Sequence, residues 1–379
     1  MDNVFAFNYP LSIIIMFFRL YETILKKRIA LYENGFFKSF SLGAFTVGVG
    51  NLTVGGTGKT PIVALAAEIL AGRGEKVCII SRGYKRENPK KRVLVSDGEK
   101  ILAAVKQAGD EPFELAGKLL GKAIVIADAD RISAAHWARP KFGITAFVLD
   151  DAFQHLRARR DSDIVTVDAT DAFGNRKLLP FGILREPPQN LKRADAIVIT
   201  RANLVENIKD LKTELRKFNS DCPIFVSGNK ISKLSELKEF PAKAQKETNY
   251  ELPITNYEMG QIQDSKVESV KPKYSAFCGL GNPQNFFRQL RNETFDLTAT
   301  ETFPDHYFYK QSDIARIEQK ARRTGAEILL TTAKDAVKLK HLKFNLPCLV
   351  VESEMIFDDG NDFRGWLIEK LENSKARKG

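Results

Sequence analysis

The sequence is poor in the residues that build zinc sites and disulfide frameworks. Its four cysteines lie far apart without a C-x-x-C pair, and it holds only four histidines. A structural zinc site is therefore not expected. The four cysteines are instead expected to be reduced thiols. Long basic blocks, RNA-binding signatures and helix-turn-helix patterns are also missing, so nucleic acid is not an expected partner. The net charge of +11 instead favours an anionic membrane surface or a phosphorylated substrate.

The N-terminal segment lacks an apolar run long enough to cross a bilayer. Residues 13–18 form a run of six, whereas a span needs about 20, and no secretory signal pattern is present. Apolar residues at helical spacing predict an amphipathic helix over 11–25, followed by basic residues at 26–28. Two interpretations stay open: a helix docked on the protein's own core, or a helix lying in the membrane interface.

The order of apolar segments predicts an α/β protein. Strongly apolar strands alternate with helices, which is typical of a parallel sheet covered on both faces. A chain of 379 residues has room for two or three domains at about 150 residues each. We expect four parts: an amphipathic, membrane-associated segment (1–36), a first α/β domain (37–228), a polar linker (229–272) and a smaller C-terminal α/β domain (273–379).

The segment TVGGTGKTP (53–61) follows an apolar strand and opens a helix. It resembles the phosphate-loop pattern G-x-x-x-x-G-K-[ST], except that Thr53 stands where the first glycine is usual. Its glycines allow backbone N–H groups to point into one concavity, and the first turn of the helix adds further unpaired N–H groups. The alternative is a tight turn with a solvated lysine. The residues expected to bind the nucleotide are Thr53, Val54, Gly55, Gly56, Thr57, Gly58, Lys59 and Thr60.

A phosphate loop also requires a partner for the metal. The Thr60 hydroxyl is expected to bind Mg²⁺, and the apolar strand FVLDD supplies Asp150 and Asp151 at its end. Aspartates in this position are also common helix caps, which is the structural alternative.

The loop by itself does not identify what receives the phosphate. The guanine-reading N/T-K-x-D motif is absent from the late strand, which ends in ITRANL. A simple ATPase needs only a positioned water, whereas a kinase needs an acceptor site and often a base. Asp110, at a helix start in AGDEPFELA, and His306, in FPDHYFY, are candidates. Each has a structural alternative, as a helix cap or as part of an aromatic cluster.

Several motifs occur together in one order: VGNLTVGGTGKTP, SRGY, GDEP, LDDAFQH, LREP, FCGLGNPQNFF, FPDHYF and KDAVKL. This ordered set, from Val49 to Leu339, resembles the tetraacyldisaccharide 4'-kinase (lipid A 4'-kinase) family. The resemblance implies an N-terminal P-loop kinase domain with a parallel sheet, a smaller C-terminal domain, both α/β/α, and an N-terminal amphipathic helix. Two departures from the family pattern are Ala152, where glycine is usual, and Ile183, where proline is common.

The resemblance also implies an activity and a location. The family transfers the γ-phosphate of ATP, with Mg²⁺, to the 4'-hydroxyl of a tetraacylated glucosamine disaccharide 1-phosphate, giving lipid IVA. It implies a peripheral protein on the cytoplasmic face of the bacterial inner membrane, with the glycolipid and the anionic membrane as partners and no obligate protein partner. The alternative from another class is a membrane-associated P-loop ATPase or GTPase switch without a lipid acceptor.

The resemblance assigns roles residue by residue. Asp110 matches the family's catalytic base, and His306 matches its partner from the second domain. Lys59 and Arg185 are expected to stabilise the charge of the transferred phosphoryl group. The expected metal region comprises Thr60, Asp150, Asp151 and Glu186.

Overall fold

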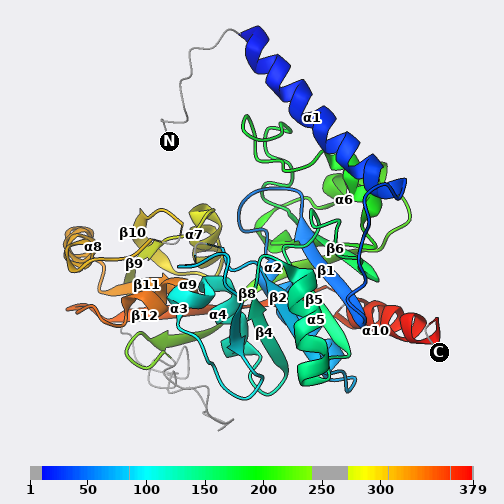
Figure 1. Ribbon diagram of the computed structural model, residues 1–379. Helices are drawn as coiled ribbons and strands as arrows, with labels where there is room; N and C mark the ends of the chain where they lie inside the picture. Colours follow the sequence, from blue (N-terminus) through cyan, green and yellow to red (C-terminus); the bar gives the residue numbers. More distant parts are fainter. Residues whose placement is uncertain (1–10, 85, 241–271, 306, 359, 378–379) are drawn as a thin grey trace. The chain divides into compact units, whose positions relative to one another are not determined.

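The computed structural model describes residues 11–84, 86–240, 272–305, 307–358 and 360–377 (Figure 1). It confirms a mixed α/β fold rich in parallel strands. The chain forms two compact units, one of Met1–Lys230 with Glu354–Gly379 and one of Ile231–Ser353. It passes between them twice, within β8 (Ile224–Glu236) and within β12 (Cys348–Phe357).

The first unit is built on a mainly parallel sheet. Its other strands are β1 (Phe45–Asn51), β2 (Val77–Ser81), β3 (Val93–Ser96), β4 (Ala123–Ala127), β5 (Ala146–Asp150), β6 (Ser162–Asp168) and β7 (Ala196–Thr200). The strand order is β8-β7-β6-β1-β5-β2-β4-β3, and among these strands β3 is the antiparallel one. Strands such as β2 (VCIIS) and β7 (AIVIT) are buried along their whole length, as a sheet covered on both faces requires.

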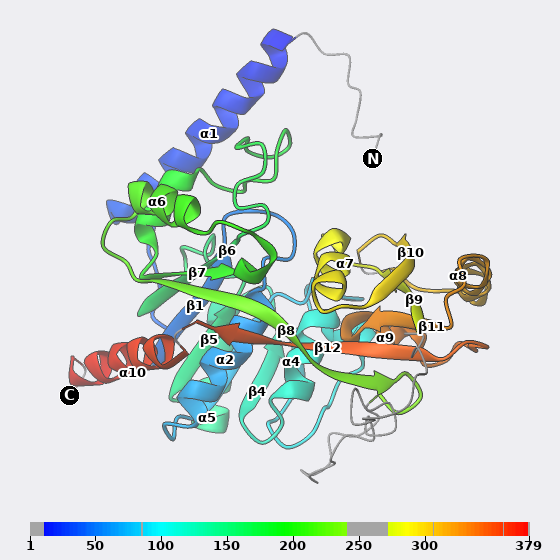
Figure 2. The same cartoon turned by 180° about the vertical axis from the view of Figure 1, so that it is seen from behind.

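Helices cover both faces of this sheet. They are α2 (Lys59–Ala71), α3 (Val105–Ala108), α4 (Asp110–Lys118), α5 (Arg131–Phe142), α6 (Lys209–Phe218) and α10 (Gly360–Ala376), with the 3-10 turns η1 (Pro188–Arg193) and η2 (Ala202–Leu204). Side chains of α2, α4 and α10 join one apolar cluster, whereas α5 packs into a second with the alternate side chains of β2 and β5. Accordingly, α5 lies in front of the sheet in Figure 1, and α2 lies in front of the sheet in the reverse view of Figure 2.

The connections of this sheet change direction at β1. Strands β2 to β5 lie on one side of β1 and β6 to β8 on the other. In an open parallel sheet, such a switch point leaves a crevice at the carboxyl ends of the strands, because the adjoining connections run to opposite sides. The strand ends at this edge include Asn51, Ser81 and Asp150.

Helix α1 (Leu11–Glu33) belongs to the first unit, and its beginning stands away from the sheet in both views (Figures 1 and 2). Tyr21 and Leu25 pack against the apolar cluster around β6 and β7, and Ile29 is buried. The second half of the helix is therefore docked on the protein's own core, as one of the two interpretations from the sequence expected.

The middle of α1 also carries exposed apolar side chains. Leu20 and Ile24 are 52% and 53% exposed. Within the described part of the chain, no helix combines the length and the apolar character that a bilayer crossing needs, as the sequence predicted.

The last helix belongs to the first unit, although the sequence-based boundary assigned it to a C-terminal domain. Phe363, Leu367 and Leu371 of α10 are buried in the cluster that α2 forms with the sheet. Apolar spacing gives each helix a buried face but does not say which sheet receives it.

The second unit has its own three layers. Its elements are β9 (Lys273–Cys278), α7 (Pro283–Asn292), β10 (Asp296–Thr302), α8 (Gln311–Arg323), β11 (Ile328–Thr332) and α9 (Ala333–Leu339). The strand order is β10-β9-β11-β12-β8, with β9 to β12 paired in parallel. Helix α7 covers one face, and α8 and α9 cover the other.

The polar stretch predicted as a linker over 229–272 begins as a strand. β8 continues to Glu236, and its partly buried Ile231 and Leu234 lie three residues apart among polar side chains. A strand is not predictable from this stretch, because it is polar on average and its two apolar residues do not follow the period-2 pattern of a half-buried strand. Leu237 and Phe240 follow and are buried in the second unit, and residues 241–271 of the predicted linker lie outside the described residues.

Candidate active site

The glycine-rich loop joins β1 to α2 and is fixed at its beginning. Thr53 is buried and forms an isolated antiparallel bridge with Leu184. Gly55 and Gly58 have φ values of 102° and 79°, whereas Thr53 is not among the described residues with positive φ. The first position of this loop therefore does not use the freedom of glycine, and a threonine fits there without strain.

The end of the loop is anchored to β6 and β7. The hydroxyl of the buried Thr57 lies 2.8 Å from that of Thr166, and its carbonyl accepts a hydrogen bond from the Thr200 hydroxyl at 3.0 Å. A Cβ on Gly58 would lie 3.2 Å from Thr200 Cγ2, whereas one on Gly56 would meet nothing within 4 Å. The loop is thus anchored on the sheet and open on its other side, where phosphate oxygens could reach its N–H groups.

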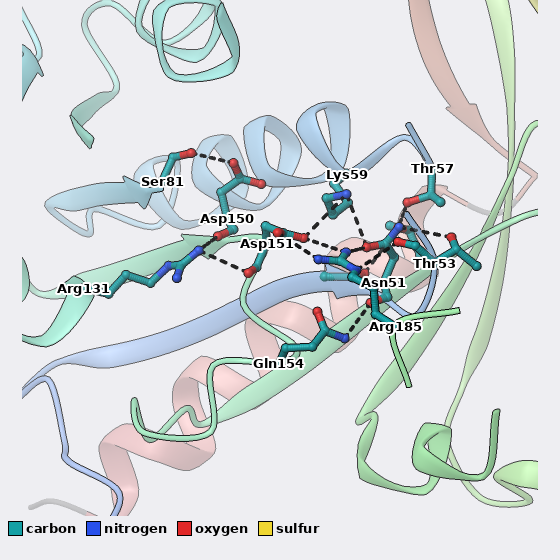
Figure 3. Close-up of polar contacts among 12 residues, drawn as sticks. Asn51, Thr53, Thr57, Lys59, Ser81, Arg131, Asp150, Asp151, Gln154 and Arg185 are labelled. Atoms are coloured by element: carbon teal, nitrogen blue, oxygen red, sulfur yellow. Dashed lines mark hydrogen bonds and ion pairs between the residues drawn. The ribbon is translucent and has the colours of Figure 1, made fainter. Parts of the chain in front are cut away.

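Lys59 and Arg185 meet at two shared oxygens (Figure 3). Lys59 Nζ lies 3.3 Å from Asn51 Oδ1 and 3.6 Å from Asp151 Oδ1. The Arg185 guanidinium donates to both oxygens of Asp151, at 2.8 and 3.0 Å, and also to Asn51 Oδ1. Two cations are therefore held side by side at the N-terminus of α2, where they could neutralise the charge of a bound polyphosphate.

The two adjacent aspartates have opposite electrostatic environments. Burial disfavours the charge of Asp151, but hydrogen bonds from Arg185 and the charges of Lys59, Arg185 and Arg131 outweigh it and hold its pKa well below the usual range. Burial and the charge of Asp151 raise the pKa of Asp150, opposed by Lys59, Ser81 and Arg131. Asp151 is therefore a fixed anion.

Asp150 has one unused oxygen. Ser81 donates to its Oδ2 at 2.8 Å, while its buried Oδ1 has no hydrogen-bond partner among the described residues. A buried carboxylate oxygen without a partner is costly unless a ligand completes it. Thr60, the other expected metal ligand, is partly buried in the first turn of α2.

Asp110 is the first residue of α4 and is partly buried. The preceding Gly109 has a φ of 89°, and a Cβ there would lie 3.1 Å from the carbonyl oxygen of Tyr84. Gly83 is packed more closely still, because a Cβ there would lie 2.7 Å from the Ala108 carbonyl oxygen. The GDEP and SRGY motifs thus touch backbone to backbone, which places the start of α4, with Asp110, against the loop that follows Ser81 at the end of β2.

Glu186 follows Arg185 but is engaged elsewhere. It is 1% exposed, and its Oε2 accepts hydrogen bonds from Arg193 and, at 2.8 Å, from Asn190. Among the contacts of the described residues, none joins Glu186 to either aspartate of the pair.

His306 lies outside the described residues. Its neighbours belong to the second unit: Asp305 forms an ion pair with Lys334 at 2.8 Å, and the ring centroids of Phe303 and Tyr309 are 4.9 Å apart. The role predicted for His306 stays a prediction.

Four further polar residues of this site were not predicted as functional. Asn51, Ser81 and Arg131 contact the loop or the aspartate pair; for example, Arg131 donates to the Asp150 carbonyl at 2.7 Å (Figure 3). The fourth, Gln154, donates to the Asn51 carbonyl at 3.0 Å. Asn51 and Ser81 end buried parallel strands, and this position could have identified them. Arg131 carried no comparable signal.

Comparisons with known proteins agree on one family. The family model described as tetraacyldisaccharide-1-P 4'-kinase matches residues 11–372. The tetraacyldisaccharide 4'-kinase of Geobacter metallireducens is 37% identical over 319 residues, covering 84% of this chain and 86% of the relative. That of Desulfotalea psychrophila is 35% identical over 348 residues, covering 91% of both.

A solved structure is similar over nearly the whole chain. The crystal structure of LpxK from Aquifex aeolicus in complex with ATP superposes with a TM-score of 0.68 at 30% identity. The match covers 95% of this chain and 98% of the other. The similarity therefore includes both units and not only the phosphate-loop region.

Proposed function

Because this chain belongs to the tetraacyldisaccharide-1-P 4'-kinase family, an ATP-dependent kinase family of lipid A biosynthesis, we propose that the loop 53–60, Lys59 and Arg185 carry the transfer of phosphate to the 4'-hydroxyl of the lipid A disaccharide. The observation that carries this assignment is the pairing of Lys59 and Arg185 on shared oxygens beside an anchored phosphate loop. Fixed cations of this kind stabilise the charge that spreads over the γ-phosphoryl group during transfer.

The loop and the two cations contact different parts of the nucleotide. The N–H groups of 55–60 and the N-terminus of α2 face the phosphates, and Lys59 neutralises the β- and γ-phosphates. Arg185 is anchored by Asp151 and by the Thr53 carbonyl, to which its Nε donates at 3.0 Å. Its guanidinium therefore needs little reorganisation when charge moves outward from the γ-phosphorus.

The donor set at the sheet edge suits Mg²⁺. The unused Oδ1 of Asp150 and the Thr60 hydroxyl are oxygen ligands of the type that Mg²⁺ prefers, with substrate phosphates and waters completing the shell. When bound, the ion neutralises phosphate charge. Asp151, already bound to Arg185, would ligate through water or remain an anchor. We assign Glu186 to fixing the segment after Arg185, because Arg193 and Asn190 occupy its Oε2.

Asp110 is the proposed acceptor of the 4'-hydroxyl proton. The new bond forms between the sugar oxygen and the γ-phosphorus, the bond from that phosphorus to ADP breaks, and the proton passes to the carboxylate. The close packing of Gly109 on Tyr84 fixes the backbone that presents Asp110. Assistance by His306 remains part of the proposal.

The substrate lipid requires the protein to work at a membrane surface. Among the described residues, several exposed large apolar side chains lie in or shortly after α1: Leu20, Ile24, Phe36, Phe37 and Phe40. Exposed apolar groups clustered in sequence, together with the net positive charge, suit an anionic interface. We propose peripheral attachment through α1 at the cytoplasmic face of the bacterial inner membrane.

The decisive experiment uses radiolabelled ATP and the tetraacylated disaccharide 1-phosphate. The expected result is label in a lipid product and consumption of ATP that depends on the glycolipid. Label released only as inorganic phosphate, at the same rate without lipid, would assign the site to an ATPase instead.

A further inference from the structure

The side chain of Asn51 contacts three other residues of the site, Thr53, Lys59 and Arg185. Asn51 ends β1, is 0% exposed, and its main-chain carbonyl accepts a hydrogen bond from Gln154 at 3.0 Å. Its Nδ2 donates to Thr53 Oγ1 at 3.4 Å, so its Oδ1 faces Lys59 and Arg185. The amide is therefore held from both sides in one orientation (Figure 3).

The acceptors around Lys59 and Arg185 differ in charge. Asp151 contributes a carboxylate to both cations, whereas Asn51 contributes a neutral amide oxygen to the same two. Among these four side chains, two positive charges share one negative charge, so the four together retain an excess of positive charge. A second carboxylate at residue 51 would cancel this excess, and both cations would be bound more strongly than by an amide.

We propose that Asn51 is a positioning residue for phosphate binding: its neutral oxygen holds Lys59 and Arg185 together in the nucleotide-free protein and yields them to phosphate oxygens when ATP enters. This inference rests on the proposed function only in that ATP occupies the loop 53–60. A neutral acceptor orders both cations without offsetting the charge that attracts the nucleotide. An acceptor at the strand end is also rigid, because β1 is paired on both sides.

Two substitutions separate this role from a purely structural one. Asn51→Asp keeps the shape of the side chain and adds a charge, whereas Asn51→Ala removes the acceptor and leaves a cavity. If Asn51 acts as a neutral acceptor, ATP affinity falls roughly tenfold in the alanine variant and roughly 10²-fold in the aspartate variant. If Asn51 only fills space, the order reverses, because the isosteric aspartate disturbs packing least.

The measurement is ATP binding by titration calorimetry on the full chain without lipid, with the melting temperature of each variant recorded. Asn373→Asp is the matched control, because it adds the same charge at an exposed position of the same unit, on α10, and it is expected to bind ATP normally. If the aspartate variant does not fold, Asn51→Ser, which keeps a neutral oxygen, is expected to bind more tightly than Asn51→Ala.

The possible failures are distinguishable. An aspartate variant that binds ATP as well as or better than the alanine variant, or a serine variant no better than alanine, overturns the role of Asn51 and leaves the kinase assignment intact. A wild-type protein that binds ATP and forms no lipid product contradicts the proposed function without changing the order expected for the Asn51 variants.

Discussion

Lys59 and Arg185, which are far apart in the sequence, contact the same pair of oxygens, Asn51 Oδ1 and Asp151 Oδ1. Neighbouring cations repel each other, so this arrangement depends on acceptors that both can reach. Because the acceptors are a strand end and the residue after another strand end, the sheet fixes the cations before substrate arrives. Such preorganisation is the main contribution a protein can make to phosphoryl transfer.

Lys59→Ala is expected to reduce kcat/KM for ATP by roughly 10²–10³, because a fixed cation is removed from the phosphates. Lys118→Ala is the matched control, since Lys118 forms an exposed ion pair with Glu114 on α4. Steady-state kinetics with saturating lipid make the comparison. Equal losses in both variants would show that the effect is not specific to the loop.

Asp110→Asn is expected to lower kcat by roughly 10²–10⁴ if the carboxylate takes the hydroxyl proton. ATP affinity is expected to remain near normal, because Asp110 is assigned to the acceptor and not to the phosphates. Glu111→Gln, the next residue of the same turn, serves as the control. A near-normal kcat for Asp110→Asn would remove the assignment of a general base.

Asp150→Asn is expected to raise the Mg²⁺ concentration needed for half-maximal activity by roughly tenfold or more. The carboxylate offers an oxygen that has no partner among the described residues, and the amide is a weaker ligand. Activity titrated with Mg²⁺ at saturating ATP provides the measurement. An unchanged Mg²⁺ requirement would place the ion on other groups.

Leu20→Asp and Ile24→Asp are expected to reduce binding to vesicles of phosphatidylglycerol and phosphatidylethanolamine while leaving the melting temperature nearly unchanged, because both side chains are exposed. Leu25→Asp, whose side chain packs against the core, is expected to lower the melting temperature instead. Vesicle sedimentation and thermal unfolding separate the two effects. Undiminished sedimentation of both exposed-site variants would argue against attachment through α1.

His155 is expected to contribute to acid sensitivity. Burial, with the nearby charges of Arg131, Arg160 and Arg157, lowers its pKa to about 4, against a small opposing effect of Asp130. A lowered folded-state pKa means that the neutral form is favoured in the folded protein. The contribution of His155 to the free energy of unfolding is therefore complete above its unfolded-state pKa near 6.5. It is lost as the pH falls towards 4, the pKa in the folded state.

The test compares His155→Gln with the wild type in urea unfolding between pH 7 and pH 4. The wild type is expected to lose more stability over this range than the variant, which has no imidazole to protonate. Parallel curves would show that His155 titrates alike in the folded and unfolded states.

Much of the site could be predicted from the sequence because its chemistry depends on contiguous residues. The loop 53–60, the aspartate pair and the helix start at Asp110 each occupy a short segment with a recognisable pattern. The order of these motifs identified the family, and the family model and relatives confirm it. The α/β class followed from continuously apolar strands, and it is confirmed as well.

Only the tertiary structure decided how these segments act on one another. Nothing local indicates that Asn51 would be the common acceptor of Lys59 and Arg185, that Glu186 would turn to Arg193, or that α10 would join the first unit. Each of these depends on which strand ends meet at one edge of a sheet and on which charges balance there. A sequence determines the patterns of single elements, whereas contacts and electrostatic balance depend on the packing of distant segments, because burial and charge act through space.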